Sequence, residues 1–404
     1  MRVLDQIKPT KRDETRVLKI IEKVLQNLDL KDAKLELGGS YAKDTWLKGN
    51  HDVDVFVRFP YDKYKEKDIS DVLKSRLKKY KVVHGSRDYF QIKKGDYVFE
   101  FIPVLDIKSS KEAKNITDVS PLHTKWVKEK LNDADQVRLV KKFCKAQGVY
   151  GAESYIRGFS GYVLEILTVH YKTFFDLVKN VANWKKGIVV DVEKFYKNKG
   201  DILEKLNKDK LSCLVVIDPV QKDRNAAAAL CEDKFDKFVA KCKEFMRNPS
   251  NDFFVERKIS IRDLKLESGE NNFLTMKVWP LKGKKDIVGS KLLKCFVYIN
   301  KKLSEEGFNV INSDWEFNEK AIFWFYVKNG TIGLYKKHYG PPKKEKKHFE
   351  EFLIKWKNHE IKKDKDKIYV ELKREHTHLK DFVKNLLKSN YVKNNVKKIK
   401  LKNY

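Results

Sequence analysis

The sequence predicts a multidomain α+β fold, and the length of the chain and two changes of pattern along it support this. With 404 residues the chain exceeds a single typical core, so two to four domains are expected. Strand and helix patterns alternate over residues 1–130, helical spacing dominates over 131–250, and the alternation returns over 251–404. We therefore expect an α/β head over residues 1–130, a helical central (neck) domain over 131–250, and a basic α/β body and tail over 251–404.

In the head, the periodicity predicts a helix near residues 13–28, with Asp13 available as its cap. The apolar residues of 53–59 recur at every second position, which is typical of a strand with one buried face. The other elements expected here are a strand at 33–39, a helix at 68–80, and two strands within 89–107 joined at Lys94-Gly95-Asp96. Together these elements predict a mixed α/β domain.

The rest of the chain predicts a helical domain followed by a small sheet. The helices expected in the middle lie around 137–144, around 162–170, and from 224 to 246, after a break at Asp218-Pro219. The last third predicts a strand at 273–279, a helix over 292–303, strands 321–328 and 331–340 paired through Asn329-Gly330, and two amphipathic helices, the second over 379–387. This order is typical of a sheet with helices on one side.

The net charge of +30, from 87 basic and 57 acidic residues, is the most extreme feature of the composition. Residues 331–404 alone carry 22 Lys+Arg against 9 Asp+Glu. Such a field attracts polyanions, and salt weakens the attraction. Nucleic acid is the expected partner. An anionic membrane and a merely lysine-rich, solvated surface are the alternatives.

The cysteine spacing and the hydropathy pattern both indicate a cytoplasmic protein. The five cysteines are widely separated and show no CxxC spacing, which supports neither a zinc site nor a disulfide framework. The first residues lack the apolar core of a signal peptide. No apolar run reaches the length of about 18 residues that a membrane span needs, so no membrane partner is expected.

A glycine turn, Gly38-Gly39-Ser40, and the pair Asp52-x-Asp54 form the sharpest chemical pattern. Glycine lets the backbone at Gly39 approach a phosphate, and the Ser40 hydroxyl can bind its oxygens. On its own such a turn is usually only a turn. Asp52 and Asp54 lie on one face of a strand, about 6.6 Å apart along the chain. Two carboxylates so placed can hold two divalent ions about 3.5–4 Å apart, as in phosphoryl displacement.

A site with two metal ions needs a third carboxylate, and Glu100 is the residue that we select. It is the only acid within the apolar strand Tyr97–Ile102, where an unpaired carboxylate is costly to bury. Asp96 and Asp106 are rivals near the strand ends. The alternative for Glu100 itself is the wet face of an edge strand.

The segment GGSYAKDTWLKGNHDVDVFVRFP resembles the signature of the polymerase-beta nucleotidyltransferase superfamily, in the version of the archaeal-type (class I) CCA-adding enzymes. The similarity continues, in order, through FEFIPV, ITDVSPLHTKW, VRLVKKFCKAQGVYGAE, RGFSGYVLEIL and DPVQKDRNAAAAL. It covers residues 30–250 and is fainter beyond, at Gly340-Pro341-Pro342 and HTHLKDFVKN.

The resemblance implies a role for each matching residue. The residues that would bind two Mg²⁺ ions are Asp52, Asp54 and Glu100. Those at triphosphate-contacting positions are Ser40, Lys43, Lys141 and Tyr150. Those near the nucleotide and its ribose are Ser120 and His123. Arg224 matches the arginine that reads the base edge with help from tRNA phosphates. The implied reaction adds C, C and A to tRNA from CTP and ATP without a nucleic-acid template, and the basic last third grips the acceptor stem and elbow.

Two departures and several alternatives accompany this interpretation. Lys43 stands where relatives often carry Arg, and Glu100 where Asp is common. Lys141 has the alternative of a solvated lysine, and Arg224 that of the first residue of an alanine-rich helix, paired with Asp218 or Asp223. For the whole chain, the alternatives are a poly(A)-polymerase-like or oligoadenylate-synthase-like transferase and a catalytically silent RNA-binding protein. The oligomeric state stays open, and a homodimer is one alternative.

Overall fold

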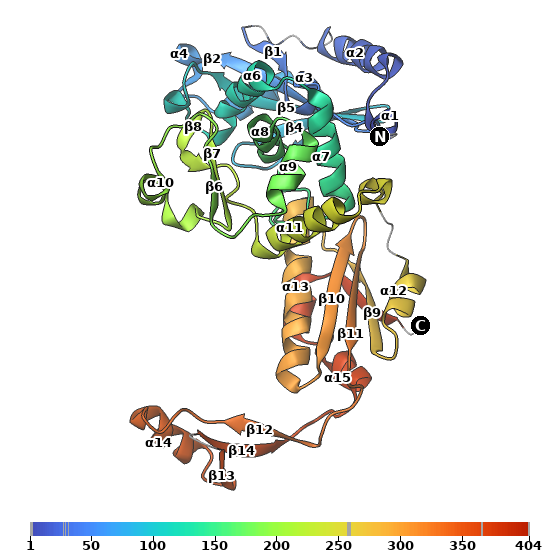
Figure 1. Cartoon of the computed structure of the whole chain (residues 1–404), viewed down its shortest axis with the longest axis vertical. Coiled ribbons are helices and arrows are strands. Elements are labelled where there is room, and N and C mark those ends of the chain that lie inside the picture. The colour runs from blue at the N-terminus through green and yellow to red at the C-terminus, as the bar shows by residue number, and fades with distance from the viewer. Residues whose placement is uncertain are drawn as a thin grey trace. The chain divides into compact units, whose positions relative to one another are not determined.

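The computed structural model confirms the multidomain α+β fold, with helices and strands alternating in two units, residues 1–257 and 258–404 (Figure 1). The structure describes residues 3–26, 28, 30, 32–256, 260–364 and 367–402. In this part of the chain no helix combines the length and the apolar composition needed to cross a bilayer. The boundary near residue 130 between head and neck stays a prediction.

A five-stranded sheet of order β1-β2-β5-β4-β3 organises the start of the first unit. Its strands are β1 (Lys34–Leu37), β2 (Asp52–Pro60), β3 (Lys81–Val83), β4 (Tyr89–Lys94) and β5 (Tyr97–Asp106). The central strands β2 and β5 run parallel and place Asp54 opposite Glu100, and β4 and β5 form the predicted hairpin around Gly95. The register therefore puts the two acids on one face of the sheet.

The two faces of β2 differ because its side chains alternate. Val53, Val55 and Val57 are fully buried, and they pack with apolar residues of helices α2 (Lys11–Gln26) and α5 (Ile69–Arg76). Asp52 and Asp54 lie on the opposite face, so the helices that cover the valines leave the acids clear. The remaining helices of this region are α1 (Val3–Ile7), α3 (Gly39–Ala42) and α4 (Tyr61–Tyr64).

Two helix boundaries in this region differ from the prediction. α2 begins before Asp13, because Thr10 caps it: the Thr10 hydroxyl accepts from the Asp13 N–H at 3.2 Å, and the Asp13 carboxylate accepts from the Thr10 N–H at 2.9 Å. α2 ends at Gln26, and residue 27 lies outside the described residues. α5 ends at Arg76, four residues earlier than expected, because strand β3 starts at Lys81.

Helices build a second core in the first unit, centred on Phe143. These helices are α6 (Ser120–Lys130), α7 (Ala134–Ala146), α8 (Gly161–Tyr171), α9 (Phe174–Val181) and α11 (Glu232–Arg247), with α10 (Lys199–Lys205) further out. The ring of Phe143 contacts five other phenylalanine rings at 5.8–6.2 Å: Phe174, Phe238, Phe245, Phe253 and Phe254. This aromatic core fixes α7, which carries Lys141, against α8 and α9.

The prediction of a helix that opens at Arg224 is wrong. Residues Gln221–Asn225 form strand β8, which pairs with β7 (Leu214–Asp218); β7 in turn pairs with β6 (Ile188–Val190). The Asn225 side chain gives the reason, because its Oδ1 accepts from the N–H groups of Val216 and Ala227, each at 2.9 Å. These bonds tie the alanine-rich segment to β7 as a turn, and α11 begins only at Glu232.

The second unit contains a four-stranded sheet of order β10-β11-β9-β15. Its strands are β9 (Asn272–Trp279), β10 (Val310–Phe317), β11 (Ala321–Val327) and β15 (Lys398–Lys402). Helices α13 (Lys285–Glu306), α15 (Leu379–Leu386) and α16 (Asn390–Asn395) share its main core, and α12 (Ile261–Glu267) contacts Trp324 and Tyr326. Most helices thus cover one side, as predicted.

The predicted pairing of 321–328 with 331–340 is wrong. β11 pairs with β9 and β10, whereas β12 (Tyr335–Tyr339) belongs to a separate sheet with β13 (Ile361–Asp364) and β14 (Lys367–Lys373). β11 is buried along nearly its whole length and takes β9 and β10 as its two neighbours, whereas the mostly exposed β12 pairs with β14. Helix α14 (Lys346–Lys355) packs on the separate sheet.

The aromatic core yields a stability prediction. Replacing Phe143 by Ala should lower the free energy of unfolding by about 3–5 kcal/mol, because the substitution removes the contacts with all five neighbouring rings and leaves a cavity. Phe175, which is half exposed on α9, is the matched control, and Phe175→Ala should change stability by less than about 0.5 kcal/mol. Urea unfolding followed by tryptophan fluorescence measures both; equal losses would contradict this account of the core.

Candidate active site

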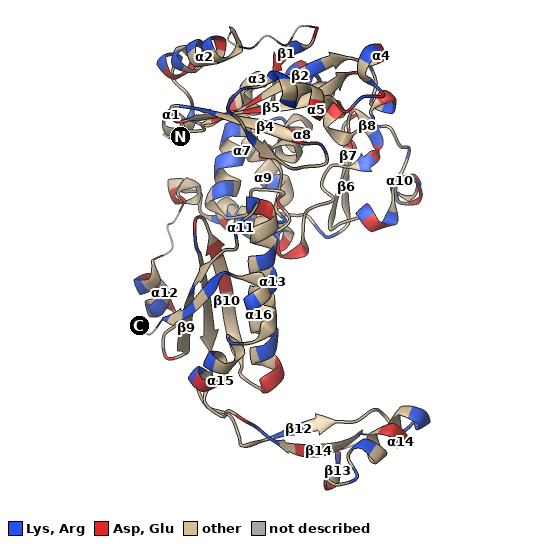
Figure 2. Ribbon diagram, turned by 180° about the vertical axis from the view of Figure 1, so that it is seen from behind, with Lys and Arg blue, Asp and Glu red and all other residues tan. Residues whose placement is uncertain are grey.

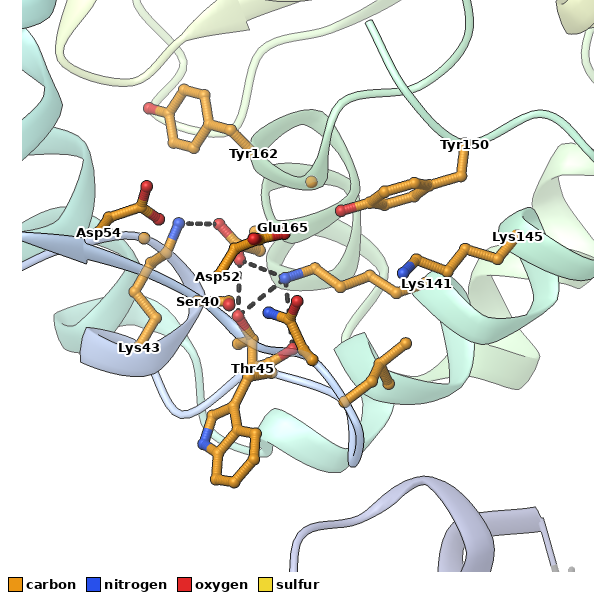
Figure 3. Close-up of a pocket in the computed structure, with 15 residues that line it drawn as sticks. Ser40, Lys43, Thr45, Asp52, Asp54, Lys141, Lys145, Tyr150, Tyr162 and Glu165 are labelled. Carbon is orange, nitrogen blue, oxygen red and sulfur yellow. Dashed lines mark hydrogen bonds and ion pairs between the residues drawn. The ribbon is translucent and has the colours of Figure 1, made fainter. Parts of the chain in front are cut away.

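A cavity of about 330 Å³ in the first unit brings together the glycine turn, the acidic face of β2, and helices α7 and α8 (Figure 3). The predicted residues that line it are Gly39, Ser40, Lys43, Asp52, Asp54, Lys141 and Tyr150. The lining residues that the sequence did not single out for the site include Thr45, Lys145, Tyr162 and Glu165. Seven of the eleven predicted site residues therefore meet in one cavity.

The two glycines are required because side chains of β2 lie against them. A Cβ atom on Gly39 would lie 1.7 Å from Asp54 Oδ2, and φ at Gly39 is +55°, which disfavours other residues. A Cβ atom on Gly38 would lie 2.7 Å from the Phe56 ring. Helix α3, which begins at Gly39, has only four residues, so its dipole contributes little to anion binding here. The glycine turn therefore leaves the space that the Asp54 carboxylate occupies.

The acidic group consists of Asp52 and Asp54 at the cavity, with Glu100 beside Asp54 on β5. Glu100 does not line the cavity; its carboxylate accepts from the Gln91 amide at 2.6 Å. Burial, and next the charge of Glu100, raise the pKa of Asp54 to about 7. Among the described residues, no three His, Cys, Asp or Glu side chains lie close enough to hold a metal ion as they stand.

This acidic group still fits a divalent cation. Like charges in a poorly hydrated place destabilise one another, and a cation between them removes that cost. The pKa of Asp54 is raised because burial and the charge of Glu100 destabilise its ionised form, and a bound cation would stabilise that form. Asp52 and Asp54 supply the oxygen ligands that Mg²⁺ prefers, and Glu100 stays the predicted third ligand.

Lys43 and Lys141 face the acidic group from the other side of the cavity, and a buried carboxylate connects them. Glu165 Oε2 accepts from the Lys43 ammonium at 2.5 Å, and Oε1 accepts from Lys141 at 2.8 Å (Figure 3). The Thr45 hydroxyl also donates to Oε1, at 2.7 Å. Burial alone would raise the pKa of Glu165, but the two lysines outweigh it and lower the pKa to about 2. Lys141 is therefore not the solvated lysine of the alternative interpretation.

Arg138 holds the loop that carries Lys43 and Thr45 in place. Its side chain is only 2% exposed, so each of its donors needs a partner within the protein. It donates to the backbone carbonyl of Trp46 at 3.1 Å and pairs with Asp44 and Asp135. Helix α7 thus positions the loop through Arg138 and the cavity wall through Lys141, one turn later.

Tyr150 and Tyr162 form an aromatic wall of the cavity (Figure 3). The Lys145 ammonium lies 5.1 Å from the Tyr150 ring centroid. Tyr162 stacks on His123 with ring centroids 4.2 Å apart. Through this contact His123, on α6, adjoins the cavity without lining it.

A second polar cluster lies behind Tyr162 and is centred on the buried carboxylate of Asp218. This carboxylate lies 3.1 Å from His123 Nε2. It accepts hydrogen bonds from the Tyr162 hydroxyl at 3.1 Å and from the Arg224 guanidinium at 2.5 Å. Burial opposes ionisation here, but His123 and Arg224 lower the pKa of Asp218 to about 2. Arg224 therefore pairs with Asp218, one of the two partners considered from the sequence.

Like Glu100 and His123, the predicted residues Ser120 and Arg224 do not line the cavity. Ser120 is the first residue of α6, and its carbonyl accepts from the Thr124 hydroxyl at 3.2 Å. Arg224 reaches the cavity region only through Asp218 and Tyr162. Glu165 is the main residue that the sequence reasoning missed. It is a lone acid in the apolar helical segment YVLEILTV, and the same criterion that selected Glu100 in an apolar strand would have found it.

The fold and the cavity define a class of protein. A glycine turn and an Asp-x-Asp strand on this sheet, faced by lysines from other segments, are those of a nucleotidyltransferase. The family model "Nucleotidyltransferase domain" matches residues 18–118. Two further models match, "tRNA nucleotidyltransferase, second domain" at residues 135–255 and "CCA-adding enzyme, C-terminal domain" at residues 282–402. Enzymes of this superfamily generally use a divalent metal ion.

Relatives over most of the chain identify the family. The CCA-adding enzyme of Nanoarchaeum equitans is 35% identical, over 84% of this chain and 84% of that protein. The CCA-adding enzymes of Methanosarcina acetivorans and Methanocaldococcus jannaschii are each 30% identical, over 89% and 96% of this chain and 81% and 90% of those proteins. The chain belongs to the family of CCA-adding enzymes, the tRNA nucleotidyltransferases.

The raised pKa of Asp54 predicts a pH-dependent effect of its replacement. The folded chain binds the proton of Asp54 up to about pH 7, whereas an unfolded chain releases it near 3.8, so ionising Asp54 costs stability as the pH rises through this window. Without metal, Asp54→Asn should therefore gain stability over the wild type as the pH rises from 5 to 8. Adding Mg²⁺ should raise the melting temperature of the wild type only.

Differential scanning fluorimetry across pH, with and without Mg²⁺, measures this effect. Asp62→Asn, at an exposed position of α4, controls for the loss of one negative charge. If the melting temperatures of Asp54→Asn and of the wild type change with pH in parallel, the destabilising effect of like charges at the acidic group is contradicted.

Proposed function

We propose that this chain adds C, C and A to the 3′ end of tRNA by nucleotidyl transfer at the cavity, with CTP and ATP as substrates and release of pyrophosphate. The carrying observation is that carboxylates on β2 and lysines from two other segments face one cavity. Such a cavity offers negative charge for metal ions and positive charge for a triphosphate. The family gives the reaction its tRNA substrate.

The residues of the cavity divide the work by charge. Asp52, Asp54 and Glu100 would hold two Mg²⁺ ions. When bound, these ions would lower the pKa of the RNA 3′-hydroxyl and stabilise charge on the departing pyrophosphate. The residues that would bind the triphosphate are Ser40, Lys43, Lys141 and Tyr150, beside the backbone of Gly39. Lysine suits this task because its ammonium is a compact donor to phosphate oxygens.

The Asp218 cluster would receive the base and the ribose. Arg224 offers guanidinium donors to acceptors on cytosine or adenine, and Asp218 limits the directions that these donors can take. His123 and Ser120 lie on α6 at this side of the cavity, near where a ribose would lie. Residues 131–250 would thus serve as the nucleotide-binding neck, which Lys141, Tyr150 and Glu165 support.

The second unit would bind tRNA at the acceptor stem and elbow. Lys and Arg residues occur throughout it, among them several on α13 and α14 (Figure 2). Contacts to phosphates and to the shape of the helix bind RNA without reading its sequence, which suits a protein that must accept every tRNA. The homodimer considered from the sequence stays a prediction, which light scattering after size-exclusion chromatography resolves.

The order of nucleotide addition tests the function. A tRNA that lacks CCA should incorporate labelled C but not A when each nucleotide is given alone, and should stop after one A when both are given. tRNA ending in C and in CC extends the same test. Extension with ATP alone into a tail would instead indicate a poly(A)-polymerase-like activity, and no incorporation at all would indicate a silent RNA-binding protein.

Replacing Asp54 by Ala should lower incorporation by at least about a thousandfold, since a metal site supplies several kcal/mol of transition-state stabilisation. Binding of tRNA, measured by filter retention, should remain within about twofold, because phosphate contacts outside the site dominate it. Asp62→Ala is the matched control. Transfer that survives in the Asp54 variant would overturn the site assignment.

A further inference from the structure

We propose that Glu165 is a positioning residue, which holds the ammonium groups of Lys43 and Lys141 in place at the cavity so that they receive the triphosphate of either nucleotide. This inference rests on the proposed function, in which the two lysines bind the triphosphate. It adds a residue that touches neither substrate nor metal ion and acts through the two lysines.

The geometry satisfies both oxygens of the Glu165 carboxylate. Oε2 accepts from Lys43 at 2.5 Å, and Oε1 accepts from Lys141 at 2.8 Å and from the Thr45 hydroxyl at 2.7 Å. Lys141 also donates to Thr45 Oγ1 at 2.9 Å. The three partners come from α7 and from the loop after α3, so one carboxylate fixes both lysines relative to each other.

The burial of this group indicates a purpose beyond folding. The Glu165 side chain is 0% exposed, and those of Lys43 and Lys141 are 9% and 5% exposed. Burying an ion triad costs several kcal/mol in desolvation, and an apolar trio of similar volume is often as stable or more so. On α8, Glu165 lies among the buried apolar residues Val163, Leu164, Ile166 and Leu167. An ordinary core helix would carry an apolar residue there.

Without Glu165, the positive charges of Lys43 and Lys141 would repel each other with no carboxylate between them. The charged or titratable groups that line the cavity with Lys141 are Glu165 and Tyr162 on α8, Lys43 after α3, Lys145 on its own helix, Asp52 and Asp54 on β2, and Tyr150. Burial and the charge of Lys43 lower the pKa of Lys141, and Glu165 raises it. Glu165 is thus the near counter-ion that keeps Lys141 protonated before a nucleotide enters.

The rival role is competition, in which the carboxylate occupies the lysines and weakens phosphate binding. The two roles predict opposite signs for Glu165→Gln. Positioning predicts weaker binding of inorganic triphosphate, by about tenfold or more, because one charge-assisted contact is lost or misdirected. The KM values for CTP and ATP should rise by the same factor, since the triphosphate is common to both, and the KM for tRNA should stay unchanged.

The pH profile separates positioning from mere support of the fold. In the Gln variant the pKa of Lys141 should fall further, because its counter-ion is gone, so triphosphate binding should weaken more between pH 6.5 and 8.5 than it does in the wild type. A purely structural role would give parallel profiles. Triphosphate binding that is unchanged or tighter in Glu165→Gln, or parallel profiles, would overturn the proposal.

Three further variants complete the experiment. Glu256→Gln is the matched control, since Glu256 is an exposed partner of Lys142 on the same helix α7, outside the cavity, and its loss should leave triphosphate binding unchanged. If Glu165→Gln does not fold, Glu165→Asp keeps the charge but shortens its reach, and it should weaken triphosphate binding less than tenfold but measurably; unchanged binding would overturn the proposal. Lys141→Met tests the underlying function. If this variant binds triphosphate as the wild type does, the assignment of Lys141 is wrong. If triphosphate binding weakens in Lys141→Met but not in the Glu165 variants, only the role of Glu165 is refuted.

Discussion

The site depends on the crowding of negative charge where β2 and β5 run side by side. The parallel register sets Asp54 opposite Glu100, and the alternation of β2 adds Asp52 on the same face. Gly39 then seats the Asp54 carboxylate so closely that no other residue fits there. This contact holds Asp54 in place, and Lys43, Lys141 and the aromatic wall of Tyr150 and Tyr162 surround the same cavity.

Charge alternates in layers away from this strand pair. The acidic group comes first, Lys43 and Lys141 come next, and the buried carboxylate of Glu165 lies behind them. Arg138 repeats the pattern one helical turn away, where it pairs with Asp44 and Asp135. The charges of Lys43 and Lys141 partly offset those of the acidic group, and Glu165 in turn is the counter-ion of the two lysines.

Local patterns predicted the acidic part of this cavity, because strand alternation is a short-range property, whereas Lys43, Lys141 and Tyr150 were expected only from the family resemblance. Asp52 and Asp54 share a face for that reason, and the turn at Gly95 brings Glu100 back to the same sheet. Glu165 escaped attention because helical periodicity assigns its neighbours to a core and says nothing about which lysines that core faces. Its partner Lys43 is 122 residues away in the sequence, and no spacing rule reaches that far.

The errors have the same origin. An alanine run favours a helix locally, but the Asn225 side chain binds across to β7 and makes a strand and a turn instead. Likewise, adjacent apolar and aromatic stretches suggested a hairpin, whereas the buried strand β11 took β9 as a neighbour from about 50 residues earlier. In both cases a contact between strands outweighed a local preference, and the periodicity of a single sequence does not display such contacts.

The segment between β11 and α15 leaves the four-stranded sheet and comes back to the point of departure. Leu379 N–H donates to the Gly330 carbonyl at 3.0 Å, and Thr331 bridges to His378. The strands and helix in between have an apolar core of their own around Phe352, Ile368 and Val370. A segment whose two ends are joined in this way, and which has its own core, is a self-contained insertion. Changes in its length would therefore leave the strand order of the four-stranded sheet intact.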